Sequence, residues 1–149
     1  MVNPIILLDS GPLGSLTTPR FSPLAVNCKR WFQSLAGSGR RILVPEIADY
    51  ELRRELLHAN KVQGVANLDR LIAQTEYLPI TTTAMRQAAQ FWAQARQQGQ
   101  PTAGDKTIDC DMILAAQAAT LGVSDFVIAT TNIKHLSRFV PADLWQNIS

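Results

Sequence analysis

Cysteine and histidine are scarce in this sequence of 149 residues, which contains two of each. Cys28 and Cys110 are far apart and form no CxxC or Cys/His grouping, so the sequence shows neither a zinc site nor a disulfide framework. We therefore expect two free thiols in a reducing compartment. His58 and His135 are not spaced with acidic residues as in HExxH, which excludes that metalloprotease motif.

Neither sign of charge dominates, because 14 basic residues stand against 12 acidic ones and the formal net charge is +2. A protein with a strong electrostatic footprint for nucleic acid would show a clustered excess of positive charge. The balance therefore permits nucleic-acid binding without requiring it.

Long hydrophobic runs are also missing. The apolar stretch at residues 4–8 is short, has no basic leader and ends at Asp9, so we expect neither a signal peptide nor a membrane span. No repeat, linker or low-complexity tract interrupts the chain, in which 46% of the residues are hydrophobic and the mean hydropathy is +0.01. We expect a single cytoplasmic globular domain, residues 1–149, with a sizeable core.

Short apolar segments predict the strands of a buried sheet. Residues 5–8 form a continuous apolar run, which is typical of a strand that is covered on both faces and ends in a turn. Further strands are predicted at residues 41–44, 76–80, 123–131 and 144–145.

Helical patterns separate these strands. Residues 15–23, in contrast, have the Ser, Thr and Pro content of a loop. The alternation of strands and helices predicts an α/β sandwich with a mainly parallel central sheet of four or five strands. The predicted helices cover residues 23–35, 46–60, 62–74, 81–98 and 107–122, with a helical turn at 134–139.

The most apolar of these helices, at residues 107–122, begins with two carboxylates. Its apolar residues run nearly all the way round a helical projection, so the helix should be buried. Asp109 is a suitable N-cap, Asp111 favours the macrodipole in the first turn, and Gly122 suits the C-terminal end. Helical positions two apart point about 200° away from each other, so both acids cannot share one face. If Asp109 caps the helix, Asp111 is free to face a metal ion.

Two other acids are candidates for the same site. Asp9 ends the first predicted strand, and ligands of open parallel sheets bind outside the carboxyl ends of the strands. A turn aspartate that hydrogen-bonds the following backbone explains Asp9 equally well. Glu51 lies on a charged helix whose face can simply be solvated, and it can also pair with Arg54.

Two competing motifs fail on their spacing. Residues 99–107 resemble a phosphate-binding Walker A loop, but Asp105 separates Gly104 from Lys106 and a helix rather than a strand precedes the loop. A Ser/His/Asp triad can be assembled from Ser10 and His135, but the Gly-x-Ser-x-Gly turn that presents such a serine is absent.

Four motifs in a fixed order carry a family resemblance. They are Ile6-Leu7-Leu8-Asp9-Ser10, Glu51-Leu52-Arg53-Arg54, Asp111-Met112-Ile113-Leu114-Ala115-Ala116-Gln117-Ala118 and Ala129-Thr130-Thr131-Asn132-Ile133-Lys134-His135-Leu136. Each motif alone is weak, but the ordered set spans nearly the whole chain and resembles the PIN-domain family, particularly its VapC-like members.

This resemblance implies a three-layer α/β/α fold with an acidic cluster at one end of a parallel sheet. It also implies RNA cleavage that depends on magnesium or manganese. Residue by residue, it implies metal ligation by Asp9, Glu51 and Asp111, with Ser10 and Asn132 in supporting positions.

The resemblance is incomplete at the fourth acid. The family's usual residue falls near Asn132, where this chain has an amide, as some members do. Asp109 either takes that fourth role or only caps its helix. Glu46, Glu55 and Asp105 are second-rank candidates.

The chemistry of such a cluster also follows from the residue types. Mg²⁺ prefers oxygen ligands and keeps several waters, so converging carboxylates without His or Cys suit it. Carboxylates that lie close together raise one another's pKa unless a cation compensates their charge. A bound ion would orient a phosphodiester, activate water and stabilise the leaving oxygen.

The main hypothesis is therefore a metal-dependent endoribonuclease, acting as the toxin of a type II toxin–antitoxin pair with a small antitoxin protein as partner. A non-catalytic PIN-like module that binds RNA or protein, and a response-regulator-like phosphoacceptor, remain open as alternatives. Plausible RNA phosphate contacts, each of which also fits an ordinary surface charge, are Arg53, Arg54, Lys106, Lys134 and Arg138. A homodimer is expected, and Trp31 or Phe91 could serve its interface, although core positions are the better default for both.

Overall fold

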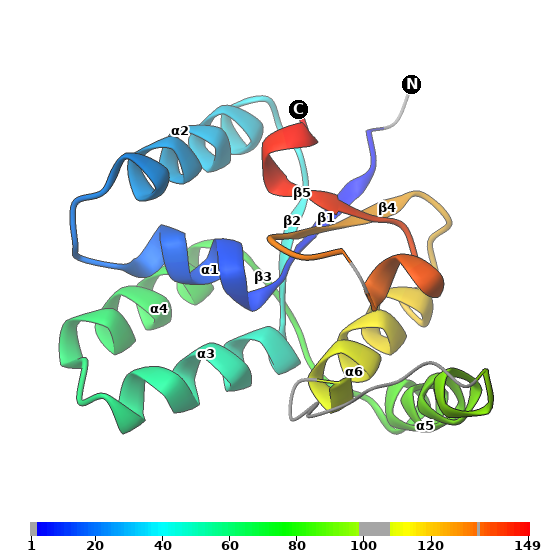
Figure 1. Ribbon diagram of the computed structural model, residues 1–149. Coiled ribbons are helices and arrows are strands. Elements are labelled where there is room, and N and C mark those ends of the chain that lie inside the picture. The colour runs from blue at the N-terminus through cyan, green and yellow to red at the C-terminus, as the bar shows by residue number, and fades with distance from the viewer. Residues whose placement is uncertain (1–2, 99–107, 134) are drawn as a thin grey trace.

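The computed structural model describes residues 3–98, 108–133 and 135–149, and these form a five-stranded sheet with helices on both sides (Figure 1). All strand pairs are parallel, and the order across the sheet is β3-β2-β1-β4-β5. The strands are β1 Ile5–Leu8, β2 Ile42–Pro45, β3 Glu76–Leu78, β4 Phe126–Thr130 and β5 Ala142–Leu144. The predicted α/β class and parallel sheet are confirmed.

Six α-helices belong to the described part of the chain, together with two short 3-10 turns at Leu136–Arg138 and Trp145–Asn147. Five of the helices lie where the sequence predicts them. The helices are α1 Ser10–Thr17, α2 Pro23–Gly37, α3 Glu46–His58, α4 Val62–Gln74, α5 Thr82–Gln97 and α6 Ile108–Ala119.

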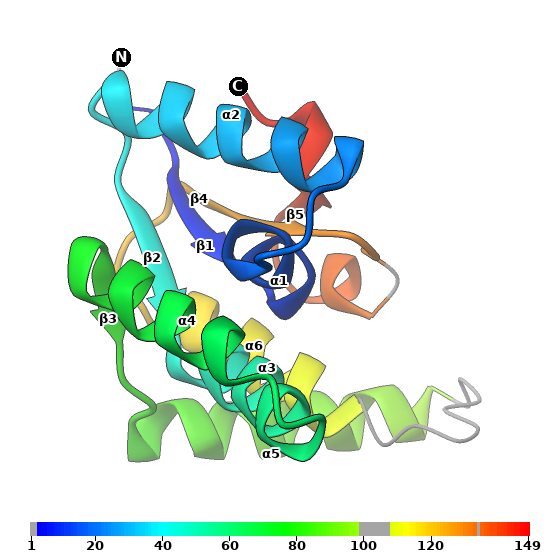
Figure 2. The ribbon, with the colours of Figure 1, turned by 90° about the vertical axis from the view of Figure 1, so that its left-hand side faces the viewer.

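Strand β1 shows why the molecule has three layers. All four of its residues are buried, because successive side chains point to opposite faces and helices cover both. Ile6 and Leu8 join the core under α1, α2 and α4, whereas Ile5 and Leu7 join the core under α6. Figure 2 shows α2, α1 and α4 over the face of the sheet that is turned toward the viewer.

Helix α6 is buried almost all round, as its sequence predicts, because α5 covers the side that does not face the sheet. Met112 and Ala116 pack against Ala84 and Ala88 of α5. A buried polar residue, Gln117, also ties α6 to its neighbours: its Oε1 accepts from the Ile47 N–H (3.2 Å) and its Nε2 donates to the Leu78 carbonyl (2.9 Å). Gln117 thereby satisfies one of the unpaired N–H groups at the start of α3, whose N-cap Pro45 has no side-chain acceptor.

Helix α1 was not predicted, and the loop expected at residues 15–23 is wrong at residues 15–17, which belong to this helix. The sequence of α1 has weak helix propensity, since it contains Gly11, Pro12 and Gly14. Pro12 lies in the first turn, however, where its missing N–H costs no hydrogen bond. Buried Leu13 anchors the helix on the sheet. Tertiary packing therefore outweighs propensity here.

The predicted bounds of the last two strands, β4 and β5, are corrected by the structure. Strand β4 begins at Phe126 rather than at residue 123, because the chain turns at Gly122 (φ +84) after α6 and residues 123–125 form an exposed connection. The last strand is Ala142–Leu144, and Trp145 begins the 3-10 turn that follows it.

The expectations for isolated apolar and sulfur side chains hold. Trp31 packs against Trp145 with ring centroids 5.5 Å apart, and Phe91 stacks on Phe139 at 4.6 Å, so both serve the core. Cys28 is a free, buried thiol, as is the only other cysteine. None of the helices in the described residues combines the length and hydropathy that a membrane-spanning segment needs.

Candidate functional site

The strand order singles out one point on the edge of the sheet. Chain connections run outward from β1 in one direction to β2 and β3, and the chain then returns to place β4 and β5 on the other side of β1. In open parallel sheets, ligands bind outside the carboxyl ends of the strands where the order reverses in this way. Here that point lies between the ends of β1 and β4.

The same strand order removes one alternative. Response regulators have the order 2-1-3-4-5, in which the first strand lies between the second and the third. In this chain β1 lies between β2 and β4. The response-regulator-like alternative is therefore wrong.

Asp9 occupies the end of β1 and is also the N-cap of α1. Its backbone N–H still follows the sheet and donates to the Ala129 carbonyl (3.0 Å), while its Oδ1 accepts from the Ser10 N–H (2.7 Å). Its Oδ2 accepts from the Thr130 hydroxyl at the end of β4 (2.7 Å). Capping and the proposed site role thus do not compete, because the carboxylate does both at the point where the strand order reverses.

The electrostatics of Asp9 are unfavourable for a charged carboxylate. Burial raises the pKa of Asp9, and the charge of Glu51 raises it further. The hydrogen bonds from Thr130 and Ser10 lower the pKa but do not restore its ordinary value. A group held in this way gains stability from a nearby cation.

Glu51 reaches the same place from α3. Its Oε1 accepts a hydrogen bond from the Ser10 hydroxyl (2.7 Å), and the Ser10 N–H is the group that binds Asp9. A single residue therefore bridges the two carboxylates, although 41 positions separate Ser10 from Glu51 in the sequence. We call Asp9 and Glu51 the acid pair.

Two further side chains lie beside Glu51. Burial raises the pKa of the Cys110 thiol on α6 to about 11, and the nearby charge of Glu51 contributes to this rise. Arg54, one turn along α3, also feels the charge of Glu51. Cys110 thus remains a protonated, neutral thiol at neutral pH, next to one acid and one cation.

Thr130 was not among the residues that the sequence predicted for the site. Its buried hydroxyl donates to Asp9 and accepts from the Asn132 N–H (3.1 Å), so it orients the first acid and the chain that leaves β4. The signal in the sequence is that Thr130 comes at the end of one apolar run, just as Asp9 comes at the end of another. That signal becomes meaningful only once β1 and β4 are known to be neighbours.

Asp109 lies on the side of α6 that faces α5. Helix α6 begins at Ile108, so Asp109 lies inside its first turn and is not the predicted N-cap. Its side chain is exposed and borders a groove of about 370 Å³ between α5 and α6, together with Trp92 and Ile113.

The donor set fits magnesium in part. One or two carboxylates with several waters are enough for Mg²⁺. The acid pair supplies two carboxylates. No group of three or more His, Cys, Asp or Glu side chains that could hold a metal ion occurs in the described residues. Among the predicted ligands, the contacts of the described residues connect Asp9 and Glu51. Asp111 lies in the first turn of α6, half-buried, beside Cys110.

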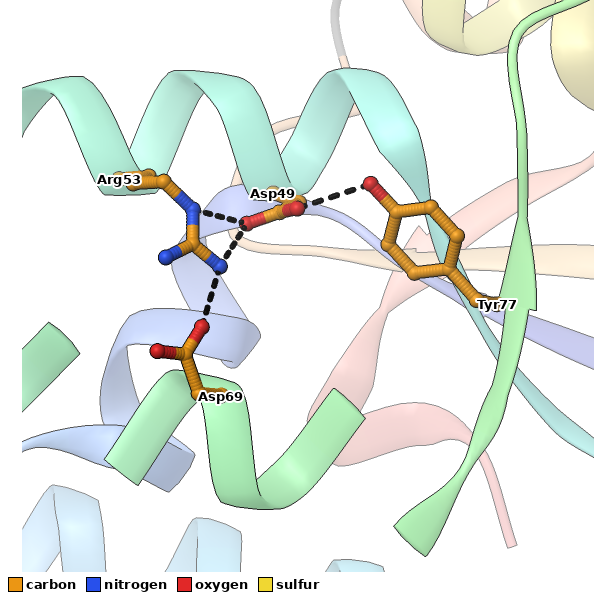
Figure 3. Close-up of polar contacts among 4 residues, drawn as sticks. All are labelled: Asp49, Arg53, Asp69 and Tyr77. Carbon is orange, nitrogen blue, oxygen red and sulfur yellow. Dashed lines mark hydrogen bonds and ion pairs between the residues drawn. The ribbon is translucent and has the colours of Figure 1, made fainter. Parts of the chain in front are cut away.

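Arg53, a predicted RNA contact, belongs to a different network. Its guanidinium binds Asp49 Oδ1 (3.0 Å) on its own helix and Asp69 Oδ1 (2.8 Å) on α4, and Tyr77 of β3 donates to Asp49 Oδ2 (2.8 Å), as Figure 3 shows. This network ties three elements together. Arg53 therefore has acceptors of its own, in contrast to Arg54, which makes no ion pair among the described residues.

The remaining candidates divide into placed and unplaced residues. Glu46 Oε1 accepts from the Ile80 N–H (2.7 Å) and so has a structural role at the start of α3, whereas Glu55 is exposed. Arg138 has a buried Nη1 without a hydrogen-bond acceptor in the described structure. Asp105, Lys106 and Lys134 lie outside the described residues.

Comparison with known proteins supports the fold. A chain of VapBC2 from Rickettsia felis, solved bound to a DNA fragment from its promoter, has a TM-score of 0.70 and 17% identity, with 95% of this chain and 98% of that chain covered. A chain of VapBC-1 from nontypeable Haemophilus influenzae has a TM-score of 0.69 and 18% identity, with 96% and 99% covered. A chain of FitAcB from Neisseria gonorrhoeae has a TM-score of 0.64 and 19% identity, with 97% and 100% covered.

At these identities the likeness is one of fold, over almost the full length of both chains in each pair. No protein-family model matches the sequence, and no curated protein matches it. The fold of the whole chain is thus shared with chains from VapBC and FitAcB structures.

Proposed function

We propose that this protein is a metal-dependent endoribonuclease and the toxin of a toxin–antitoxin pair. The observation that carries the proposal is the acid pair, in which Ser10 bridges Asp9 and Glu51 where the strand order reverses. Oxygen donors in that arrangement suit Mg²⁺ or Mn²⁺, and phosphodiesters are among the substrates on which such ions act.

The similar structures support the toxin–antitoxin part of the proposal. Chains from VapBC and FitAcB structures share this fold over nearly their whole length. We propose a small antitoxin protein as the partner of this chain, and a homodimer as its own assembly. Co-purification with the product of a small neighbouring open reading frame tests the first, and sedimentation analysis tests the second.

The residues of this chain would have separate roles in binding the ion and the substrate. Asp9 and Glu51 would hold the ion, with Asp111 as a further ligand from α6. Ser10 and Thr130 keep the acid pair oriented by donating hydrogen bonds to its oxygens before substrate arrives. When bound, the divalent ion would orient the phosphodiester and favour ionisation of an attacking water. Asn132, held by Thr130 through its backbone N–H, would support substrate beside the acid pair.

The decisive experiment is cleavage of RNA by the purified protein with Mg²⁺ or Mn²⁺. We expect Asp111→Asn to abolish cleavage, because an amide keeps the size of the side chain but removes the negative charge that a cation needs. EDTA should abolish cleavage in the same way. Glu55→Gln, an exposed acid on α3, is the matched control and should cleave normally.

Cleavage that survives both EDTA and the Asp111→Asn substitution would reject the metal-dependent mechanism. The readout is the rate of appearance of product fragments on a denaturing gel, with equal amounts of folded protein confirmed by circular dichroism.

One observation favours the second candidate, a non-catalytic PIN-like module that binds RNA or protein. No three potential ligands in the described residues form a metal site, and the chain has an amide at Asn132 where the family resemblance implies an acid. A pure binding module need show no magnesium affinity that depends on Asp9 and Glu51.

Calorimetric titration with Mn²⁺ or Mg²⁺ separates the two candidates. The nuclease requires binding that is lost in Asp9→Asn and in Glu51→Gln. Equal heats of binding in the unsubstituted protein and in both variants favour the binding module instead.

A further inference from the structure

Tyr50 and Arg54 form a cation–aromatic pair on α3, one helical turn apart. The Arg54 Cζ lies 5.2 Å from the centroid of the Tyr50 ring. A hydrogen bond with Tyr50 also raises the pKa of the Arg54 guanidinium. Side chains four positions apart on a helix are neighbours, so the pair is built into α3 by spacing alone.

Tyr50 does not serve the core. The residues that α3 buries are Ile47 and Ala48, whereas 55% of Tyr50 is exposed. An aromatic ring with a guanidinium on one side and more than half of its surface open is well suited to stack on another planar group.

Arg54 connects this ring to the acid pair. The charge of Glu51 acts on its guanidinium, which places Arg54 beside the second acid. Its Nε is buried and has no hydrogen-bond acceptor in the described part of the chain. A buried donor without an acceptor costs free energy, so an oxygen that accepts a hydrogen bond from this guanidinium would stabilise it.

The neighbouring arginine on α3 has different contacts. Arg53 has two carboxylate partners, Asp49 and Asp69, which hold it between α3 and α4. Arg54 has an aromatic ring and an unmet donor instead. Phosphate oxygens are strong acceptors for guanidinium groups, and arginine binds them in a planar, directional way.

We infer that Tyr50 and Arg54 form a nucleotide subsite for single-stranded RNA next to the acid pair. The Tyr50 ring stacks on an unpaired base, and Arg54 holds the phosphate that joins this nucleotide to the scissile position. Stacking on aromatic side chains is the usual way in which proteins hold unpaired bases, and it requires a base that is not already paired in a duplex. The inference rests on the proposed ribonuclease function and deepens it.

The test is binding of a short fluorescein-labelled single-stranded RNA, followed by fluorescence anisotropy in EDTA so that metal-dependent cleavage is stopped. Tyr50→Ala should raise the dissociation constant by about tenfold, which is within the range for loss of one base–aromatic stack. Tyr50→Phe should bind nearly as well as the unsubstituted protein, because the ring remains. A blunt duplex of the same sequence should bind independently of Tyr50.

Arg54 has a separate readout in the salt dependence of binding. Removing one phosphate contact should lower the slope of log K against log[salt] by about 0.7 for a single strand. Arg54→Gln should show this lower slope, whereas Arg54→Lys should keep the slope and lose part of the affinity.

Matched controls exist for both residues. Phe21 is 87% exposed on the segment between α1 and α2, and Arg30 is exposed on α2. Phe21→Ala and Arg30→Gln should change neither affinity nor slope beyond experimental error. Thermal unfolding of all variants should match that of the unsubstituted protein, because none of these side chains is in the core.

The outcomes separate this inference from the proposed function. Tyr50→Ala binding as tightly as Phe21→Ala, an equal loss in Tyr50→Phe, a Tyr50 effect of the same size on the duplex, or no binding by the unsubstituted protein would each overturn the subsite. RNA cleavage in Mg²⁺ can still occur in those cases, which leaves the nuclease proposal standing. Tyr50-dependent binding without any cleavage in Mg²⁺ or Mn²⁺ would reject the nuclease and keep the subsite.

Discussion

At the scale of single residues, Asp9 shows how one side chain serves both fold and site. It caps α1 with one carboxylate oxygen and accepts from the end of β4 with the other, so removing it would loosen two elements. The same burial that fixes its position makes its negative charge unfavourable. Without a cation, the folded protein is more stable when Asp9 is protonated, whereas the proposed metal binding requires Asp9 to be ionised.

This opposition predicts the effect of Asp9→Asn on stability. Because the pKa of Asp9 is raised in the folded state, its contribution is most favourable at low pH and is lost as the pH rises through that raised pKa. Asn keeps an oxygen for the Ser10 N–H and can donate to the rotatable Thr130 hydroxyl, so the contacts survive without the charge. In EDTA at pH 7 we expect Asp9→Asn to melt about 2–4 °C higher, the shift that ~1 kcal/mol produces in a chain of this size.

The measurement is thermal unfolding in EDTA between pH 4 and pH 8. The advantage of Asp9→Asn should shrink as the pH falls, because the unsubstituted carboxyl then becomes protonated in the folded state. An advantage that is constant across this range, or a loss of stability at pH 7, would contradict the assignment of the effect to the charge.

At the scale of elements, most of the fold was readable from the sequence because the signals are local. Helix α4 was predicted with its observed bounds, Val62–Gln74, since a regular apolar stripe carries it. Helix α1 was missed because its glycines and proline give a turn-like pattern, and the burial of Leu13 that stabilises it depends on the sheet. Local patterns predict an element only where local energetics dominate.

The glycines of α1 give a prediction about how closely this helix approaches β4. A Cβ at Gly11 would lie 2.7 Å from both Cγ2 and Oγ1 of Thr131, which is too close. We expect Gly11→Ala to destabilise the protein by about 1–3 kcal/mol, as overpacking does. Adding Thr131→Ala should recover part of this loss, because both of the closest atoms are then absent.

Gly14 is the matched control within the same helix. A Cβ there would meet only Leu52 Cδ1, at an ordinary 3.6 Å. Gly14→Ala should therefore stabilise the protein by about 0.5–1 kcal/mol through helix propensity alone. Urea unfolding of the three variants measures these differences, and a Gly11→Ala variant as stable as Gly14→Ala would show that α1 does not press on the end of β4.

At the scale of the whole molecule, the site was only partly predictable because its residues meet through the strand order. Asp9 and Glu51 were recognised from ordered motifs, and the structure brings them together through Ser10. Thr130 was missed because nothing local shows that β4 lies next to β1. The face on which Asp109 lies also depends on where α5 packs, which the sequence of α6 alone does not contain.

Because the acid pair exists only in the folded chain, a bound cation must be linked to global unfolding. An ion that binds the native state alone stabilises it by about 1.4 kcal/mol at ten times its dissociation constant, which raises the melting temperature by about 3–6 °C. We expect Mn²⁺ to produce such a rise in the unsubstituted protein, EDTA to reverse it, and Asp9→Asn or Glu51→Gln to remove it. Glu55→Gln should keep the full effect, since that exposed acid lies further along α3. A rise of equal size in the Asp9→Asn/Glu51→Gln double variant would place the ion elsewhere on the molecule and remove the acid pair as its site.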